Sequence, residues 1–338
     1  MEGTIPPPFP RGLTANAMPL HFGDPDAETQ ACVTNLAVFD YSFILRVQVQ
    51  GPDAQRAVLE FCGRDLSRLP RGCIRYALHG DSYGNLLSDV TVWRTGPEQF
   101  ELMSGRSQDV EDLGGIITPL NAQMIDLSTD TACFAVQGPE TDRFLTQMGV
   151  HEDLYNIPYF EFRDLPMFGE IFRVGRLGFT GLPGVEILSP RSTASSLWRK
   201  LSSKIRPAGM IAADRIRLSA GFVLFTQEFA PEVTAADAGL GRFRSVASAE
   251  GNQRQIRVCR VSFRAQKVSG SLEEALWSEG QIFPPSSGKI AVTSIRALPG
   301  TQEVFGMGYL NTNEKTMDMI ESSKNLRDIS IIHRFENN

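Results

Sequence analysis

The stretches VQGPDAQRAVLEF (49–61) and VQGPETDRFLTQM (136–148) are two copies of one pattern, and this repeat decides the fold. Each copy reads as a strand, a Gly-Pro turn and a helix that begins with the proline. Residues at helical spacing share one face of each predicted helix: Ala54, Ala57, Val58 and Phe61 in the first, and Thr141, Phe144, Leu145 and Met148 in the second. The repeat therefore predicts two related α/β subdomains in the first half of the chain. A chance match between two ordinary strand–turn–helix segments is the alternative.

The segments that surround the second copy predict further strands. Three strands joined by short turns predict an antiparallel meander: CIRYALHGD (73–81), NLLSDVTVWR (85–94) and QFELMSG (99–105). After the second copy, EIFRVGRLGFTGLPGVEILSP (170–190) predicts two strands joined by a Gly-rich loop. A helix with one apolar face is predicted to follow over residues 192–205.

The last quarter of the sequence predicts a separate β region. The polar, unperiodic tract SVASAEGNQRQ (245–255) is typical of a linker. Beyond it, short apolar stretches separated by turn residues predict a small C-terminal β-barrel or sandwich. These stretches are IRVCRVSF (256–263), GQIFPP (280–285), GKIAVTSIRAL (288–298) and EVFGMGYL (303–310).

The composition is that of an ordinary soluble protein, with 338 residues of which 42% are hydrophobic and 21% charged, enough for two or three domains. A net charge of −6 gives no basic surface for nucleic acid, and no apolar run reaches the roughly 20 residues of a transmembrane helix. The Pro-rich segment 1–12 lacks the apolar stretch of a signal peptide, so we expect a loose arm. The five cysteines form no C-x-x-C pair and the four histidines no i,i+4 pair. We therefore expect a cytoplasmic, metal-free protein that binds neither nucleic acid nor membrane.

A serine nucleophile is the first candidate for chemistry. GDSYG (80–84) matches the G-x-S-x-G pattern, which works only where a strand turns sharply into a helix. Here another predicted strand follows, so we expect Ser82 on a hairpin loop. The serine hydrolase reading is therefore disfavoured.

Asp89 lies among strand-forming residues, although aspartate is uncommon in strands and unfavourable when buried. Period-two alternation places it on one face with Thr91 and Trp93. It is either a solvated residue of an edge strand or a carboxylate that lines a pocket, with a raised pKa suited to proton or cation chemistry. Glu186 repeats the pattern between two apolar residues. Two such carboxylates beside Gly-rich turns favour the functional reading.

Eight motifs in one order resemble the folate-dependent family of the glycine-cleavage T-protein (aminomethyltransferase). Its relatives include the folate domains of dimethylglycine- and sarcosine-oxidising enzymes and tetrahydrofolate-dependent demethylases. The resemblance extends roughly from residue 28 to residue 310. The motifs are FDYS (39–42), Gly72 with Tyr76, GNLLSD (84–89), QGP (137–139), RLGFTGLPGVE (176–186), AADRIRLSAG (212–221), TAADAGLG (234–241) and GKIAVTS (288–294).

The resemblance implies an α+β fold with a three-subdomain cloverleaf, in which two related α/β subdomains with antiparallel sheets surround a central channel that holds tetrahydrofolate. A C-terminal β-barrel completes it. We therefore expect a folate-binding and catalytic region of two interleaved subdomains over residues 1–248 and the barrel over 249–338.

The resemblance also implies a site. Glu186 matches the family's pterin-binding glutamate, whose carboxylate accepts a pair of hydrogen bonds from adjacent N–H groups of the ring. Asp89 matches the catalytic aspartate near the N5 and N10 nitrogens of the folate. Tyr76 and Phe179 match aromatic residues that flank the flat pterin.

Four positions depart from the family's pattern. Ser104 stands where the family has an asparagine. Leu182 replaces the acid that follows the Y-T-G motif, and Phe179 replaces the tyrosine of that motif. Ala213 stands where the family has an arginine, so an expected anchor for the tail carboxylates of the folate is missing. We expect Arg215 to take its place as a cofactor-binding residue.

The expected function is a one-carbon transferase that moves a methyl, methylene or aminomethyl group between tetrahydrofolate and a small amine, ether or thioether. A partner enzyme that supplies the one-carbon unit is compatible with this function. Two alternatives stay open. One is a non-catalytic folate-binding protein, and the other is an enzyme on the same scaffold that has lost folate dependence and acts on a specialised metabolite.

Overall fold

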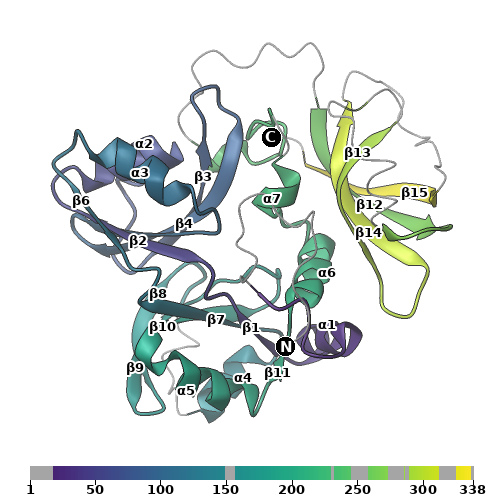
Figure 1. Ribbon diagram of the computed structural model, residues 1–338, viewed down its shortest axis with the longest axis horizontal. Helices are drawn as coiled ribbons and strands as arrows, with labels where there is room; N and C mark the ends of the chain where they lie inside the picture. Colours follow the sequence, from purple (N-terminus) through teal and green to yellow (C-terminus); the bar gives the residue numbers. More distant parts are fainter. Residues whose placement is uncertain are drawn as a thin grey trace. The chain divides into compact units, whose positions relative to one another are not determined.

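The computed structural model describes residues 18–148, 157–229, 232–244, 258–272, 285, 289–311 and 325–335. These residues form three sheets flanked by helices, which confirms the expected α+β class (Figure 1). The chain divides into two compact units: Met1–Ala77 with Asp89–Ile216, and Leu78–Ser88 with Arg217–Asn338. The predicted N-terminal arm, and the linker that holds the predicted domain boundary at 248/249, lie outside the described residues. The domain boundary stays a prediction.

A five-stranded sheet has the order β3-β4-β5-β2-β6. Its strands are β2 (Leu45–Gln50), β3 (Ile74–Gly80), β4 (Leu86–Gly96), β5 (Gln99–Ser104) and β6 (Gln123–Asp126). Helices α2 (Ala54–Cys62) and α3 (Asp109–Ile117) cover one face and bury a core against it (Figure 1). The predicted meander is confirmed, since β3, β4 and β5 are consecutive neighbours.

A six-stranded sheet in the first unit has the order β11-β1-β7-β10-β9-β8. Its strands are β1 (Ala37–Asp40), β7 (Thr131–Gln137), β8 (Phe162–Met167), β9 (Glu170–Gly175), β10 (Gly184–Pro190) and β11 (Arg206–Pro207). Helices α4 (Thr141–Gln147) and α5 (Arg191–Ser202) pack on one face, and helix α1 (Pro25–Thr34) precedes β1. The side chains of every second residue on the central strands enter this core: Val38, Phe134, Val136, Val174, Val185 and Ile187.

The sequence repeat is a structural repeat. In each copy a strand, β2 or β7, enters a Gly-Pro turn and continues as a helix, α2 or α4. Gly51 and Gly138, the glycines of the two turns, have φ angles of 118° and 135°, which disfavour any residue with a Cβ. The predicted helix faces are confirmed, because the residues named for them are buried or packed against the two cores.

The C-terminal strands form a four-stranded antiparallel sheet with the order β13-β14-β12-β15. Its strands are β12 (Val258–Lys267), β13 (Ile290–Ala297), β14 (Glu303–Asn311) and β15 (Leu326–Phe335). The sheet matches the expected β region, although no pairing closes it into a barrel within the described residues. Most of the predicted strand at 280–285 lies outside them. Helices α6 (Met210–Ala220) and α7 (Phe225–Glu228) and the short helix η1 (Gly241–Phe243) precede the sheet.

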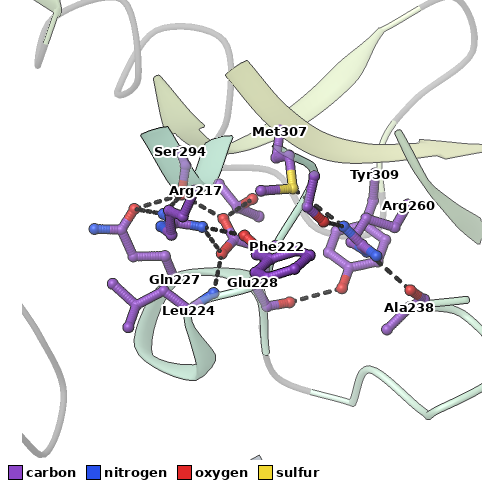
Figure 2. Close-up of polar contacts among 12 residues, drawn as sticks. Arg217, Phe222, Leu224, Gln227, Glu228, Ala238, Arg260, Ser294, Met307 and Tyr309 are labelled. Carbon is purple, nitrogen blue, oxygen red and sulfur yellow. Dashed lines mark hydrogen bonds and ion pairs between the residues drawn. The ribbon is translucent and has the colours of Figure 1, made fainter. Parts of the chain in front are cut away.

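A buried polar network joins these helices to the C-terminal sheet within the second unit (Figure 2). Arg217 on α6 and Glu228 on α7 form an ion pair of 2.8 Å, and both side chains are fully buried. The guanidinium also donates to the Phe222 carbonyl at 2.8 Å and to Ser294 Oγ on β13 at 2.9 Å. Tyr309 on β14 donates its hydroxyl proton to the Glu228 carbonyl at 2.7 Å. These bonds satisfy a charge pair that would be very unfavourable in the core alone.

The longest described helix, α5, has 12 residues. No described helix is long and apolar enough to cross a bilayer.

Candidate functional site

The two sheets of the first unit contact each other through the faces that the helices leave uncovered. Trp93 on β4 is fully buried, with its ring centroid 5.2 Å from that of Phe162 on β8. The same indole lies so close to Gly175 on β9 that a Cβ at this glycine would overlap it. Glu101 on β5 forms an ion pair of 2.8 Å with Arg173 on β9. We call these two apposed surfaces the inter-sheet faces.

Asp89 lies on the inter-sheet face of the first sheet, as the alternation along its strand predicts. Its neighbours Val90 and Val92 are buried in the core beneath α2 and α3. Thr91 and Trp93 share the other face, because Trp93 Nε1 donates to Thr91 Oγ1 at 3.0 Å. Asp89, two residues before Thr91 on the same strand, is half-buried. Its side chain is therefore directed toward the second sheet.

Glu186 lies on the inter-sheet face of the second sheet. On β10 it is directly opposite Ala135 on β7 and Gly175 on β9, whereas its neighbours Val185 and Ile187 point into the opposite core. Glu186 is only 8% exposed, and no described residue donates a hydrogen bond to its carboxylate or forms an ion pair with it. Burial raises the pKa of Glu186 from 4.5 to about 7. An acidic group with these properties can accept hydrogen bonds from a ligand and can exchange a proton near neutral pH.

The loop that joins β9 to β10 carries Phe179 and is fixed by Gln137. The buried Gln137 carboxamide donates to the Leu177 carbonyl at 3.3 Å and accepts from Thr180 Oγ1 at 2.9 Å. A Cβ at Gly184, where β10 begins, would overlap this carboxamide. The glutamine of the Q-G-P motif thus positions the Gly-rich loop that leads to Glu186.

Gly184→Ala tests the loop clamp. We expect this substitution to lower the free energy of unfolding by about 1–3 kcal/mol, because the added methyl group displaces the Gln137 carboxamide from a packed site. Urea unfolding measures the effect. Gly115→Ala is the control, since a Cβ there meets nothing within 4 Å and alanine favours helix α3 by roughly 0.5–1 kcal/mol. Equal stability changes in the two variants would contradict the clamp.

The other predicted site residues are placed as follows. Tyr76 on β3 is half-buried and lies on the side opposite the buried core residue Ala77, which is the side of Asp89 on the neighbouring strand. Phe179 is half-buried in the clamped loop. Arg215 on α6 is engaged elsewhere, by an ion pair of 2.7 Å with Asp26 on α1. The structure therefore brings Asp89, Glu186 and Tyr76 to the inter-sheet faces, and a ligand role for Arg215 stays a prediction.

The serine nucleophile reading is not supported by the local structure. Ser82 is exposed in the turn between β3 and β4, and strand β4 follows it. The strand-to-helix turn that a nucleophile elbow needs is not formed at this position.

Two residues of the inter-sheet face were not predicted as site residues, although both belong to motifs that carry the family resemblance. Gln137 belongs to Q-G-P, and Tyr41 belongs to F-D-Y-S. Tyr41 is 5% exposed, and no residue in the described part of the chain forms a hydrogen bond with its buried hydroxyl. Alternation within β1 and β7 could have placed both side chains opposite the helix-covered core.

The model of the family described as the GCVT N-terminal domain matches residues 13–248, more than half of the chain. The chain belongs to this GCVT family. The family resemblance carried by the sequence motifs is thereby confirmed.

Named GCVT relatives extend this result. An aminomethyltransferase of Rubrobacter xylanophilus is 34% identical over 227 residues, which are 66% of this chain and 60% of that protein's length. A probable aminomethyltransferase of Halobacterium salinarum is 29% identical over 311 residues, 87% of this chain and 85% of that protein. The crystal structure of glycine cleavage system aminomethyltransferase T from Bartonella henselae matches with a TM-score of 0.73 at 23% identity, over 88% of this chain and 85% of that chain. This last likeness supports the GCVT fold.

Proposed function

We propose that the protein is an enzyme that transfers a one-carbon group between tetrahydrofolate and a small amine, ether or thioether. The observation that carries the proposal is Glu186, a buried carboxylate with no described partner on the inter-sheet face. A carboxylate desolvated in this way is unfavourable unless donors reach it, so the residue suits a ligand that brings adjacent N–H groups. The names of the aminomethyltransferase relatives support the same reaction class.

The residues present fit a bound pterin. The Glu186 carboxylate would accept a pair of hydrogen bonds from the N–H edge of the ring and fix its orientation. Phe179, on the clamped loop, and Tyr76 offer aromatic surfaces for its flat faces. Tetrahydrofolate supplies the nitrogen atoms that carry the one-carbon group when it is bound. Holding both reactants in one site would raise the rate through proximity and orientation.

Asp89 is proposed as the catalytic residue. It is half-buried on β4, an inner strand of the five-stranded sheet, rather than on a loop, so hydrogen bonds to strands on both sides fix its backbone. A carboxylate in that position can hold or move a proton at the nitrogen that exchanges the one-carbon group, and can stabilise positive charge that develops there. A partner enzyme that delivers the one-carbon unit is part of the proposal.

An enzyme of the same scaffold that does not use folate is the second candidate. It is favoured by the region of α6 that was expected to hold the folate tail. Ala213 is fully buried there, and the Arg215 guanidinium is paired with Asp26. No cation in this part of α6 is therefore available to the tail carboxylates without breaking an existing ion pair.

Titration calorimetry with tetrahydrofolate under anaerobic conditions separates the candidates. We expect the wild-type protein to bind tetrahydrofolate, and the Asp89→Asn variant to bind it with an affinity within about 3-fold of wild type. The turnover of this variant on a panel of N-, O- and S-methyl donors should fall by about 100-fold or more. Glu186→Gln should weaken binding by roughly 10- to 100-fold, because charge-assisted hydrogen bonds are lost. Failure of the wild-type protein to bind would reject the proposal in favour of the second candidate. Binding without turnover on any donor would indicate a folate-binding protein.

A further inference from the structure

Tyr41 carries a polar group that the proposed mechanism does not use. Its side chain is 5% exposed, and the buried hydroxyl has no hydrogen-bond partner among the described residues. The ring is held between Phe39 and Phe43, at centroid distances of 5.9 and 6.0 Å. A buried phenol hydroxyl without a hydrogen-bond partner lowers the stability of the ligand-free protein. Such a group is therefore suited to donate a hydrogen bond to a bound ligand.

Strand register places Tyr41 on the same sheet face as Glu186. The Tyr41 N–H donates to the Cys133 carbonyl at 2.9 Å, which extends the β1–β7 pairing by one residue. Glu186 lies two strands away on β10, opposite Ala135. The side chains of Cys133 and Ala135, which lie between them on β7, are both small. The tyrosine ring and the carboxylate therefore flank the same stretch of β7.

The electrostatics agree with this placement. The pKa of Tyr41 is raised by burial first, and then by the charge of Glu186. The pKa of the buried Cys133 thiol is raised by the same two causes. Tyr41 is therefore neutral at physiological pH and offers an O–H donor beside a carboxylate acceptor.

A ligand that satisfies both groups must present N–H donors next to an acceptor atom. A simple amine or carboxylic acid lacks this arrangement, whereas a 2-amino-4-oxo-pyrimidine ring has two adjacent N–H donors beside its 4-oxo oxygen. We propose that the Tyr41 hydroxyl donates a hydrogen bond to the 4-oxo group of the ring whose N–H edge pairs with Glu186. This inference rests on the proposed function and adds the donor that recognises one atom of the substrate.

Tyr41→Phe removes only the hydroxyl, and we pair it with a change in the ligand. Calorimetry measures the binding of tetrahydrofolate, and of its 4-thioxo analogue, to wild type and variant. The analogue keeps both N–H donors, but its sulfur is a weak hydrogen-bond acceptor. We expect the variant to bind tetrahydrofolate roughly 10-fold more weakly and to bind the analogue within about 2-fold of wild type. Equal effects on both ligands, or no effect on either, would overturn the inference while leaving the proposed function intact. Failure of wild type to bind either ligand would reject both.

Thermal unfolding of the free protein supplies a second readout. Because the Tyr41 hydroxyl has no described partner, Tyr41→Phe should leave the melting temperature unchanged or raise it. Tyr309→Phe is the matched control, since that buried hydroxyl donates to the Glu228 carbonyl at 2.7 Å and its removal should lower the melting temperature. A Tyr41→Phe variant that loses stability as Tyr309→Phe does, or that fails to fold, would assign the hydroxyl a structural role and overturn the inference.

Discussion

Glu186→Gln is expected to stabilise the ligand-free protein by about 3 kcal/mol at pH 8 and to leave its stability nearly unchanged at pH 4. Burial raises the pKa of Glu186 from 4.5 in the unfolded chain to about 7 in the folded protein. Between these values the folded state binds a proton that the unfolded state has released. The free energy of unfolding of wild type therefore falls as pH rises through this window, and the amide side chain avoids the loss because it does not ionise.

Urea unfolding of wild type and variant at unit intervals from pH 4 to pH 8 measures this difference. The two curves should coincide at the acid end and separate as pH rises toward 7. Glu170→Gln is the control, because Glu170 is an exposed carboxylate on the neighbouring strand β9. Its curve should run parallel to that of wild type. A Glu186→Gln curve that also stays parallel would show that Glu186 is solvated rather than buried.

Ionisation of Glu186 lowers the stability of the free protein but should strengthen ligand binding. Under the proposed function the ionised form of Glu186 accepts the N–H pair, so the affinity for tetrahydrofolate rises with pH until about 7 and then levels off. Tyr41 and Cys133, the other titratable groups whose pKa values Glu186 raises, stay neutral over this range. Substitution of a ligand-binding residue is expected to stabilise the free protein and to weaken binding, as predicted here for Glu186→Gln.

The repeat and the alternating strands could be predicted because their signals are local. The Gly-Pro turns at Gly51 and Gly138 require backbone angles that glycine supplies, and the residues around them repeat the same spacing. Helix α1 and strand β15 were not predicted because their sequences lack such a local signal. The buried residues of α1 are Glu28 and Cys32, which give no apolar stripe, and most side chains of β15 are exposed or half-exposed.

The candidate site was predicted in part. Asp89 and Glu186 stood out because carboxylates are uncommon in strands, but their meaning depends on tertiary contacts. Glu28 is also a buried carboxylate, yet it accepts hydrogen bonds from the N–H groups of Phe22 at 2.6 Å and Gly209 at 3.0 Å. It is structural, whereas Glu186 has no described partner. Sequence shows the residue type, and only the structure distinguishes a satisfied carboxylate from one that lacks donors.

The fully buried ion pair of Arg217 and Glu228 carries the second large prediction. We expect Glu228→Ala to lower the free energy of unfolding by about 3–5 kcal/mol, because it leaves the Arg217 guanidinium charged and buried without its partner. The same substitution removes the acceptor of the Leu224 N–H at 2.7 Å and of Thr293 Oγ1 at 3.0 Å. Urea unfolding monitored by circular dichroism measures the loss.

A double-variant cycle separates the ion pair from the packing around it. Arg217→Met with Glu228→Ala removes both charges, so the loss should be smaller than the sum of the two single losses. Arg56 and Glu60 supply the control, since they form an ion pair of the same 2.8 Å on the exposed surface of α2. Removing either of these two should leave the melting temperature nearly unchanged. Additive losses at Arg217 and Glu228 would mean that packing, rather than the pairing of buried charges, connects α6 and α7 to the C-terminal sheet.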